Sequence, residues 1–148
     1  MWTSAFDASG KAEDQDFVVV AGFVAQAKLW IEFDRAWRAR LAEDHLARFH
    51  MSDWFHGKGL FGDRAYWTLD RRQRILDDLV DIIQWHASAK FACAIINKSF
   101  TTSISPANRQ QFLLNSYVLA ARAVIELANE WSLYRDNSPF AHVFEERQ

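Results

Sequence analysis

The most constraining stretch of this chain is the run from Phe17 to Ala25, which reads FVVVAGFVA. The run is apolar, rich in β-branched residues and of strand length, so we expect it to lie in the middle of a sheet. A shorter apolar segment precedes it, in which Trp2, Ala5 and Phe6 lead to Asp7. An acid at the end of a buried strand is costly unless its charge is compensated, and a cation is the usual compensation. The stretch therefore predicts two neighbouring strands and makes Asp7 a candidate metal ligand.

Asp7 also has a simpler interpretation, because the sequence Asp7-Ala8-Ser9-Gly10 is typical of a turn. An aspartate side chain often accepts a hydrogen bond from the backbone of a turn, and glycine tolerates the positive φ that such a turn can require. The sequence leaves both interpretations open, a turn cap and a cation ligand.

The size and composition of the chain predict one domain with a well-filled core. It has 148 residues, half of them apolar and 15% aromatic, with five glycines and two prolines; single cores are typically about 100–200 residues long. The net charge of −2 argues against a strong overall positive field for gripping nucleic acid. The single cysteine, Cys93, is expected to be a small buried side chain in a reducing compartment.

No membrane partner is expected from the sequence. The longest apolar run, Phe17 to Ala25, is far shorter than the ~20 residues that cross a bilayer, and no signal sequence is recognisable at the N-terminus. The sequence therefore predicts a cytoplasmic protein.

Helical periodicity appears first after the two predicted strands. A repeat of apolar residues every four positions predicts an amphipathic helix from about Lys28 to about Asp44. The aromatic-rich stretch from Phe49 to His56 does not continue this period and is expected to be an ordered loop or a short extended piece. A second helix is predicted from about Asp70 to His86, with Thr68 or Asp70 as its N-cap. Its inward-facing residues are expected to be Leu76, Leu79, Val80 and Ile83.

The rest of the chain predicts two more strands and a long helix. Phe91 to Phe100 has the composition of a buried strand. Ser105-Pro106 is a typical helix start, and a stripe of apolar residues then predicts one helix that continues to Trp131. The segment from Phe140 to Glu145 predicts a last strand that ends on an acid. This order of elements predicts an α/β fold, with a mixed sheet covered by helices.

Five short motifs, taken in order, resemble the domain of unknown function 3800 family, which is similar to the ribonuclease H-like superfamily of metal-dependent nucleases, integrases and resolvases. They are Asp7-Ala8-Ser9-Gly10, the strand from Phe17 to Gly22, the helix carrying Trp30, Phe33, Trp37 and Leu41, the sequence Phe49-His50-Met51-Ser52-Asp53, and Val143-Phe144-Glu145.

The resemblance implies a ribonuclease H-like domain over residues 1–148. Asp7 would be the acid of the first strand, and Glu145 the acid of a later strand beside it. Members of the family usually carry a further helix after the glutamate. Because the sequence stops at Gln148, we expect this domain to lack its final helix.

Such a pair of acids suits phosphodiester hydrolysis. Two divalent ions about 4 Å apart stabilise the charge on the attacking and leaving oxygens, and Mg²⁺ or Mn²⁺ prefers carboxylate and water ligands. We therefore predict a nucleic-acid substrate, with Asp7 and Glu145 as metal ligands. Other candidate site residues are Asp53 or Glu146 for a third oxygen, His50 to orient a water or contact a phosphate, and Ser9 and Gly10 to bind substrate.

Several alternatives remain at this point. The spacing His50-x-x-Asp53-x-x-His56 permits a zinc site, although its aromatic neighbours favour structural packing. Trp54 and Trp67 are expected in the core, with base stacking as the alternative. At the level of function, the alternative to a nuclease is a catalytically inactive ribonuclease H-like module with a binding or structural role. Burial of Asp7 or Glu145 in a salt bridge to an arginine would favour that alternative.

Overall fold

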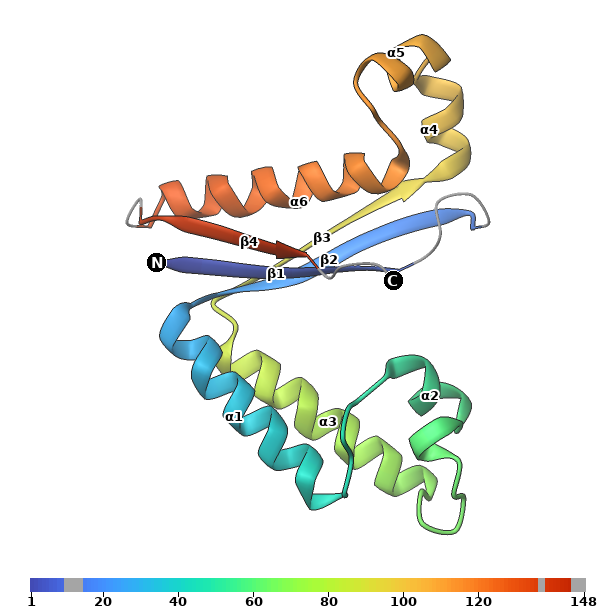
Figure 1. Ribbon diagram of the computed structural model, residues 1–148, viewed down its shortest axis with the longest axis vertical. Helices are drawn as coiled ribbons and strands as arrows, with labels where there is room; N and C mark the ends of the chain where they lie inside the picture. Colours follow the sequence, from blue (N-terminus) through green and yellow to red (C-terminus); the bar gives the residue numbers. More distant parts are fainter. Residues whose placement is uncertain (10–14, 136–137, 145–148) are drawn as a thin grey trace. The chain divides into compact units, whose positions relative to one another are not determined.

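The computed structural model describes residues 1–9, 15–135 and 138–144 of the chain. These residues belong to two compact units (Figure 1). The first unit comprises Met1–Ala27 and Ser88–Gln148, and the second comprises Lys28–Ala87. The prediction of a single domain stays a prediction.

The first unit is built on a four-stranded mixed sheet with the strand order β3-β2-β1-β4. Its strands are β1 (Trp2–Ser9), β2 (Phe17–Gln26), β3 (Ala89–Ile96) and β4 (Phe140–Phe144). Strand β2 pairs antiparallel with both β1 and β3, whereas β4 pairs parallel with β1. The β-branched run thus forms a central strand, and the prediction of an α/β protein with a mixed sheet is confirmed.

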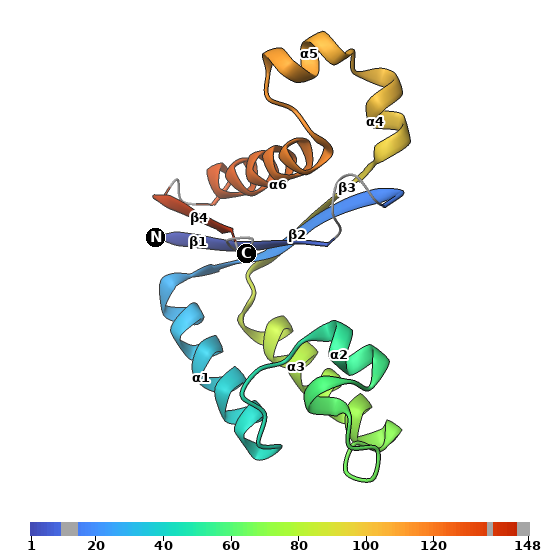
Figure 2. The same cartoon turned by 45° about the vertical axis from the view of Figure 1, so that its right-hand side comes forward.

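Helix α6 (Ser116–Leu133) covers one face of this sheet, as Figure 1 and the turned view in Figure 2 both show. Its Ala120, Val124 and Ala128 recur every four residues and are fully buried. They belong to the same core as Trp2, Phe6, Val20 and Val24 of the sheet. Even-numbered residues of β1 and β2 therefore face α6, because side chains alternate along a strand.

The single long helix predicted from Ser105 to Trp131 is wrong, because the structure has two helices there. Ser105 does cap the first one, α5 (Pro106–Gln111), by accepting a hydrogen bond from a backbone N–H. The chain then breaks at Leu113, which is exposed and has φ of 49°. Asn115 starts α6, and its side-chain oxygen accepts the N–H of Val118. This cap satisfies a helix-end donor and favours a new start.

The strand predicted from Phe91 to Phe100 also needs correction. Strand β3 ends at Ile96, and α4 (Asn97–Ser103) follows it directly. In this helix the hydroxyls of Thr101 and Thr102 donate back to carbonyls one turn earlier, and Phe100 is buried. Phe100, whose apolar side chain suggested a longer strand, is therefore the buried residue of a short helix.

The second unit is helical. It contains α1 (Ala27–Glu43), α2 (Met51–His56), the short 3₁₀-helix η1 (Gly59–Phe61) and α3 (Leu69–His86). Both long helices agree with the predicted ones, and Thr68 is the N-cap of α3, its hydroxyl accepting from the N–H of Arg71. The inward stripe of α3 differs in part, because Ile75 and Leu79 are buried and Val80 is exposed. The buried apolar residues of this unit are Leu41, Leu46, Phe61, Trp67, Ile75 and Leu79.

The loop predicted for Phe49 to His56 is wrong over most of its length, since Met51–His56 forms α2. The helix ends at Gly57, which adopts φ of 60° and ψ of 49°, a left-handed conformation that glycine adopts without strain. A helix of six residues is too short to show a clear period, which is why its sequence resembled a loop.

Within the described residues, no helix is long and apolar enough to cross a membrane.

Candidate functional site

Asp7 lies in β1, two residues before the end of the strand, and its backbone is paired with that of Ala21 in β2. Its side chain is exposed and belongs to the odd-numbered set of β1, on the face away from α6. One carboxylate oxygen, Oδ1, accepts the N–H of Ala8 at 2.6 Å. An exposed carboxylate keeps its hydration, so the expectation of a buried acid that needs a cation to offset desolvation is wrong.

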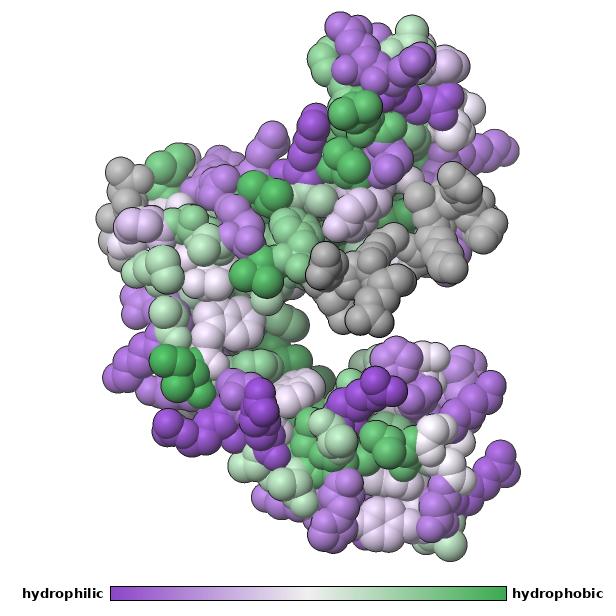
Figure 3. All heavy atoms as spheres, in the orientation of Figure 1, coloured by the Kyte–Doolittle hydropathy of each residue, from purple (hydrophilic) through white to green (hydrophobic). Residues whose placement is uncertain are grey.

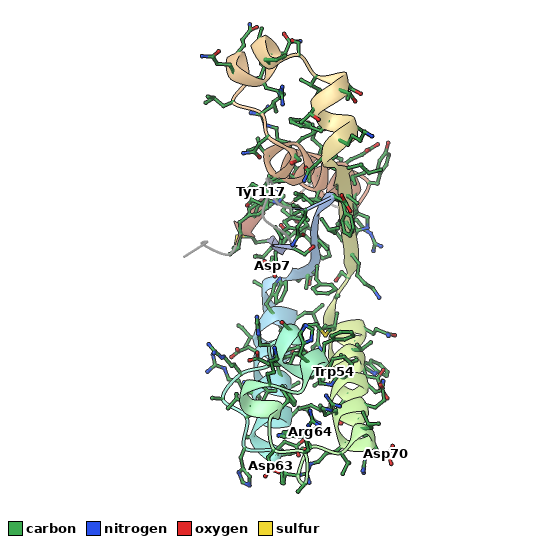
Figure 4. All side chains as sticks on the ribbon, turned by 90° about the vertical axis from the view of Figure 1, so that its right-hand side faces the viewer. Asp7, Trp54, Asp63, Arg64, Asp70 and Tyr117 are labelled. Atoms are coloured by element: carbon green, nitrogen blue, oxygen red, sulfur yellow. The ribbon has the colours of Figure 1, made fainter. Side chains whose placement is uncertain are left out.

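Asp7 is also without a basic partner in the described part of the chain, where no lysine or arginine nitrogen lies within 4.0 Å of its carboxylate. The arginine salt bridge that would favour an inactive module is therefore not seen at Asp7. Figure 4 labels this residue on the sheet of the first unit.

The parallel pairing of β1 and β4 brings the carboxyl ends of these strands to the same edge of the sheet. Phe6 is paired with Phe144, and these residues immediately precede Asp7 and Glu145 in the sequence. Glu145, Glu146 and Gly10 lie outside the described residues. Ser9 is the last residue of β1 and is exposed.

His50 and Asp53 belong to the second unit, whereas Asp7 and Ser9 belong to the first. His50 precedes α2 and Asp53 lies in its first turn, with 3.5 Å between His50 Nδ1 and Asp53 Oδ1. No third ligand joins them, because no three His, Cys, Asp or Glu side chains among the described residues come close enough to hold a metal ion. The roles predicted for His50 and Asp53 stay predictions.

The aromatic residues near this pair are packed only in part, because Phe49 and Trp54 pack against the core of the second unit and Phe55 is 70% exposed. Trp67 is buried, and its ring centroid lies 4.7 Å from that of Phe61. Trp54 is partly buried, and its Nε1 donates to the carbonyl of Arg72 at 2.8 Å. A base cannot stack on a buried ring, so Trp67 is a core residue.

The sequence did not predict the buried charge network around Asp44. The side chain of Asp44 is 7% exposed; its Oδ2 accepts from Arg40 Nη1 at 2.8 Å, and its Oδ1 accepts from Arg71 Nη2 at 2.6 Å. Arg71 also donates to the Tyr66 hydroxyl and lies over its ring, 3.8 Å from the centroid. Burial opposes ionisation of Asp44, but hydrogen bonds from Arg40 and Arg71 outweigh it and hold its pKa below the ordinary value.

A second unforeseen network joins β1, β4 and α6. The Ser4 hydroxyl lies 2.8 Å from His142 Nδ1, and His142 Nε2 lies 3.0 Å from Asn129 Oδ1. Burial lowers the pKa of His142. The arrangement has the order of a nucleophile, a base and an orienting amide, but Ser4 is fully buried and no substrate can reach its hydroxyl. We therefore interpret this network as structural.

Comparison with protein-family models, curated proteins and solved structures finds no match to this chain.

Proposed function

We propose that the chain is a metal-dependent phosphodiesterase of the ribonuclease H-like type, acting on nucleic acid through carboxylates at the β1/β4 edge of its sheet. The proposal rests on one observation above all, the parallel pairing of β4 with β1 next to Asp7.

The pairing of the two strands supports Glu145 as the partner of Asp7. Phe6 is paired with Phe144, and Asp7 and Glu145 are the next residues in the sequence. Two acids that are far apart in the sequence therefore each follow one member of the same residue pair.

The chemistry of Asp7 fits a hard divalent ion such as Mg²⁺ or Mn²⁺, since it offers carboxylate oxygens without a competing cation among the described residues. The hydrogen bond from Ala8 to Oδ1 restricts the rotation of the carboxylate, and Oδ2 is left to bind. When bound, the ion supplies charge stabilisation for the attacking and leaving oxygens of the phosphodiester. Asp7 and Glu145 would hold it at the sheet edge, and the strands would keep their side chains in place.

The test is a cleavage assay with labelled single- and double-stranded DNA and RNA, in Mg²⁺, in Mn²⁺ and in a chelator. We expect Asp7→Asn to lower the metal-dependent rate by at least about 100-fold, because loss of a direct ligand exceeds the 10–100-fold effect of an outer-shell change. We also expect an unchanged or higher Tm, because in the proposed site the change removes like-charge repulsion between Asp7 and Glu145.

Asp81→Asn is the matched control, since Asp81 is an exposed acid on α3 and its loss should leave the rate unchanged. Full activity in the Asp7→Asn variant would refute the assignment. Absence of cleavage by the unaltered protein on every substrate would also contradict it and favour the non-catalytic module.

A further inference from the structure

The second unit contains a pocket of about 290 Å³ between α2 and the start of α3. Phe61 and Trp67 contribute to its lining and are both buried. Phe55 also lines it and is 70% exposed, and Figure 3 shows hydrophobic and hydrophilic side chains next to each other on this unit. The volume is near the lower end of the range of small-molecule sites, about 300–1,000 Å³.

The ionisable side chains in the lining are two arginines and a histidine. His56, Arg64 and Arg72 line the pocket, and no carboxylate is among its lining residues. Arg64 and Arg72 make no ion pair with any described acid. Two guanidinium groups without a counter-charge around an aromatic lining are suited to an anion.

Arg72 is held in a defined position. Its Nη1 donates to the Trp54 carbonyl at 3.0 Å, and Trp54 Nε1 donates to the Arg72 carbonyl in return. Gly57 allows this close approach, because a Cβ at that position would lie 3.1 Å from Nη1. The Nε of Arg72 is buried and finds no acceptor among the described residues. Holding a partly buried cation in this way is unfavourable unless an anion joins it.

Asp63 and Asp70 are direct sequence neighbours of the lining residues Arg64 and Leu69. Asp63 accepts hydrogen bonds from the N–H groups of Ala65 and Tyr66, and these bonds hold its carboxylate against the backbone of its own turn. Asp70 is in the first turn of α3 and offsets the positive potential of that helix end. Figure 4 labels both acids together with Arg64 and Trp54 in this unit. Neither acid lines the pocket, so an anion would be held by the two guanidinium groups.

We propose that this pocket binds one nucleotide unit, with its phosphate on Arg64 and Arg72 and its base against Phe55. Guanidinium groups bind phosphate through paired hydrogen bonds, and an exposed aromatic ring stacks on a base of any sequence. The ligand is either a free mononucleotide or a nucleotide within a single strand, since both present the same phosphate and base. This inference uses residues of the second unit alone and does not depend on catalysis at Asp7.

Calorimetric titration of the full chain with adenosine 5′-monophosphate tests the proposal, with inorganic phosphate, adenosine and a short single-stranded oligodeoxyadenylate as further probes. We expect saturable binding of one nucleotide, with adenosine and phosphate each at least about tenfold weaker. Tighter binding of the oligonucleotide than of the mononucleotide identifies a strand as the source. The reverse order identifies a free nucleotide.

The variants assign the binding to this pocket. Arg72→Gln and Arg64→Gln should each weaken nucleotide binding by about tenfold, the effect of a charge-assisted hydrogen bond. Arg64 is exposed, so its variant stays informative even where loss of the Trp54 contact destabilises Arg72→Gln. The matched control is Arg74→Gln, an exposed arginine on α3 outside this lining, which should stay within about twofold of the unaltered protein.

Two results would overturn the proposal: no saturable binding of any probe, or binding that both Arg64→Gln and Arg72→Gln leave unchanged. Asp7→Asn should retain nucleotide binding in full. Cleavage that depends on Asp7 without saturable nucleotide binding would contradict the pocket assignment alone. Nucleotide binding that depends on Arg64 and Arg72, in a protein that cleaves no substrate, would contradict the proposed activity alone.

Discussion

The carboxylate of Asp44 is expected to be the most important single charge for the stability of the second unit. It accepts three hydrogen bonds from arginines, one from Arg40 at 2.8 Å and two from Arg71 at 2.9 and 2.6 Å, and a longer one from the Tyr66 hydroxyl at 3.5 Å. Removing one partner of a buried ion pair costs about 3–5 kcal/mol. Arg40 is 14% and Arg71 37% exposed, so water can rehydrate part of the released charge. We therefore expect Asp44→Asn to lower the free energy of unfolding by about 2–4 kcal/mol.

The effect depends on pH in a defined direction. The pKa of Asp44 is lowered in the folded protein, so the unfolded chain binds its proton more readily. Its contribution to stability is complete above the unfolded pKa of about 3.9 and is lost as the pH falls through the lower folded pKa. The difference in stability between the unaltered protein and Asp44→Asn should therefore shrink from pH 7 to pH 3.

Urea denaturation at both pH values, followed by circular dichroism, measures these differences. The matched control is Asp34→Asn, because Asp34 pairs with Arg38 at 2.9 Å while both side chains are exposed. Exposed pairs of this kind contribute about 0.5 kcal/mol or less. A loss at pH 7 no larger for Asp44→Asn than for Asp34→Asn would refute the reasoning from burial.

Three further predictions concern the first unit. Burial lowers the pKa of His142, so the free energy of unfolding should fall as the pH drops below about 6.5. Thermal denaturation at pH 7.5 and 5.5 checks this. A His142→Gln variant should show a smaller difference in Tm between the two pH values. Gly22→Ala should lower the free energy of unfolding by about 3 kcal/mol or more, since its Cβ would overlap the Ala5 carbonyl and lie 2.8 Å from Phe6 Cα. A Tm equal to that of the unaltered protein would contradict the close pairing of β1 with β2. Asn115→Ala should cost about 1 kcal/mol through loss of the α6 N-cap, measured by urea denaturation, and no change would mean that the cap is dispensable.

The parts of the fold that the sequence predicts best are the long elements with one dominant pattern. The apolar run from Phe17 to Ala25 is β2, and the periodic segment from Lys28 to Asp44 is α1 within one residue at each end. In both, many residues repeat the same signal, so a local exception does not change the outcome. The N-cap at Thr68 was also predictable, because capping depends on residues close in sequence.

Short elements and breaks were not predictable in the same way. Helix α2 has six residues, and the break before α6 depends on the backbone of Leu113, a residue type that rarely adopts positive φ. The apolar stripe itself continues across that break, since Leu113 and Tyr117 are four residues apart. Periodicity alone therefore could not reveal where one helix ends and another begins.

The networks around Asp44 and His142 could not be predicted for a different reason, because their partners are distant along the chain. Asp44 and Arg71 are 27 residues apart, and Ser4 and His142 are 138 apart. Nothing in the local pattern distinguishes Asp44, which follows the end of α1, from the acids on that helix. Only the packing of α1 against the segment that carries Tyr66 and Arg71 gives it a role.

The contrast between Asp44 and Asp7 bears on which acid is available for chemistry. Asp44 is buried and fully compensated by two arginines, so its charge is committed to the fold. Asp7 is exposed and carries one hydrogen bond, from Ala8, within the described residues; a turn cap or a surface position explains that bond without any ligand. What distinguishes Asp7 is its place in β1, the strand that pairs parallel with β4. Loss of an exposed acid that only caps a turn should leave metal binding unchanged, whereas loss of a metal ligand should weaken it. Calorimetric titration of Mn²⁺ into Asp7→Asn and the unaltered protein therefore decides between these two roles independently of any substrate.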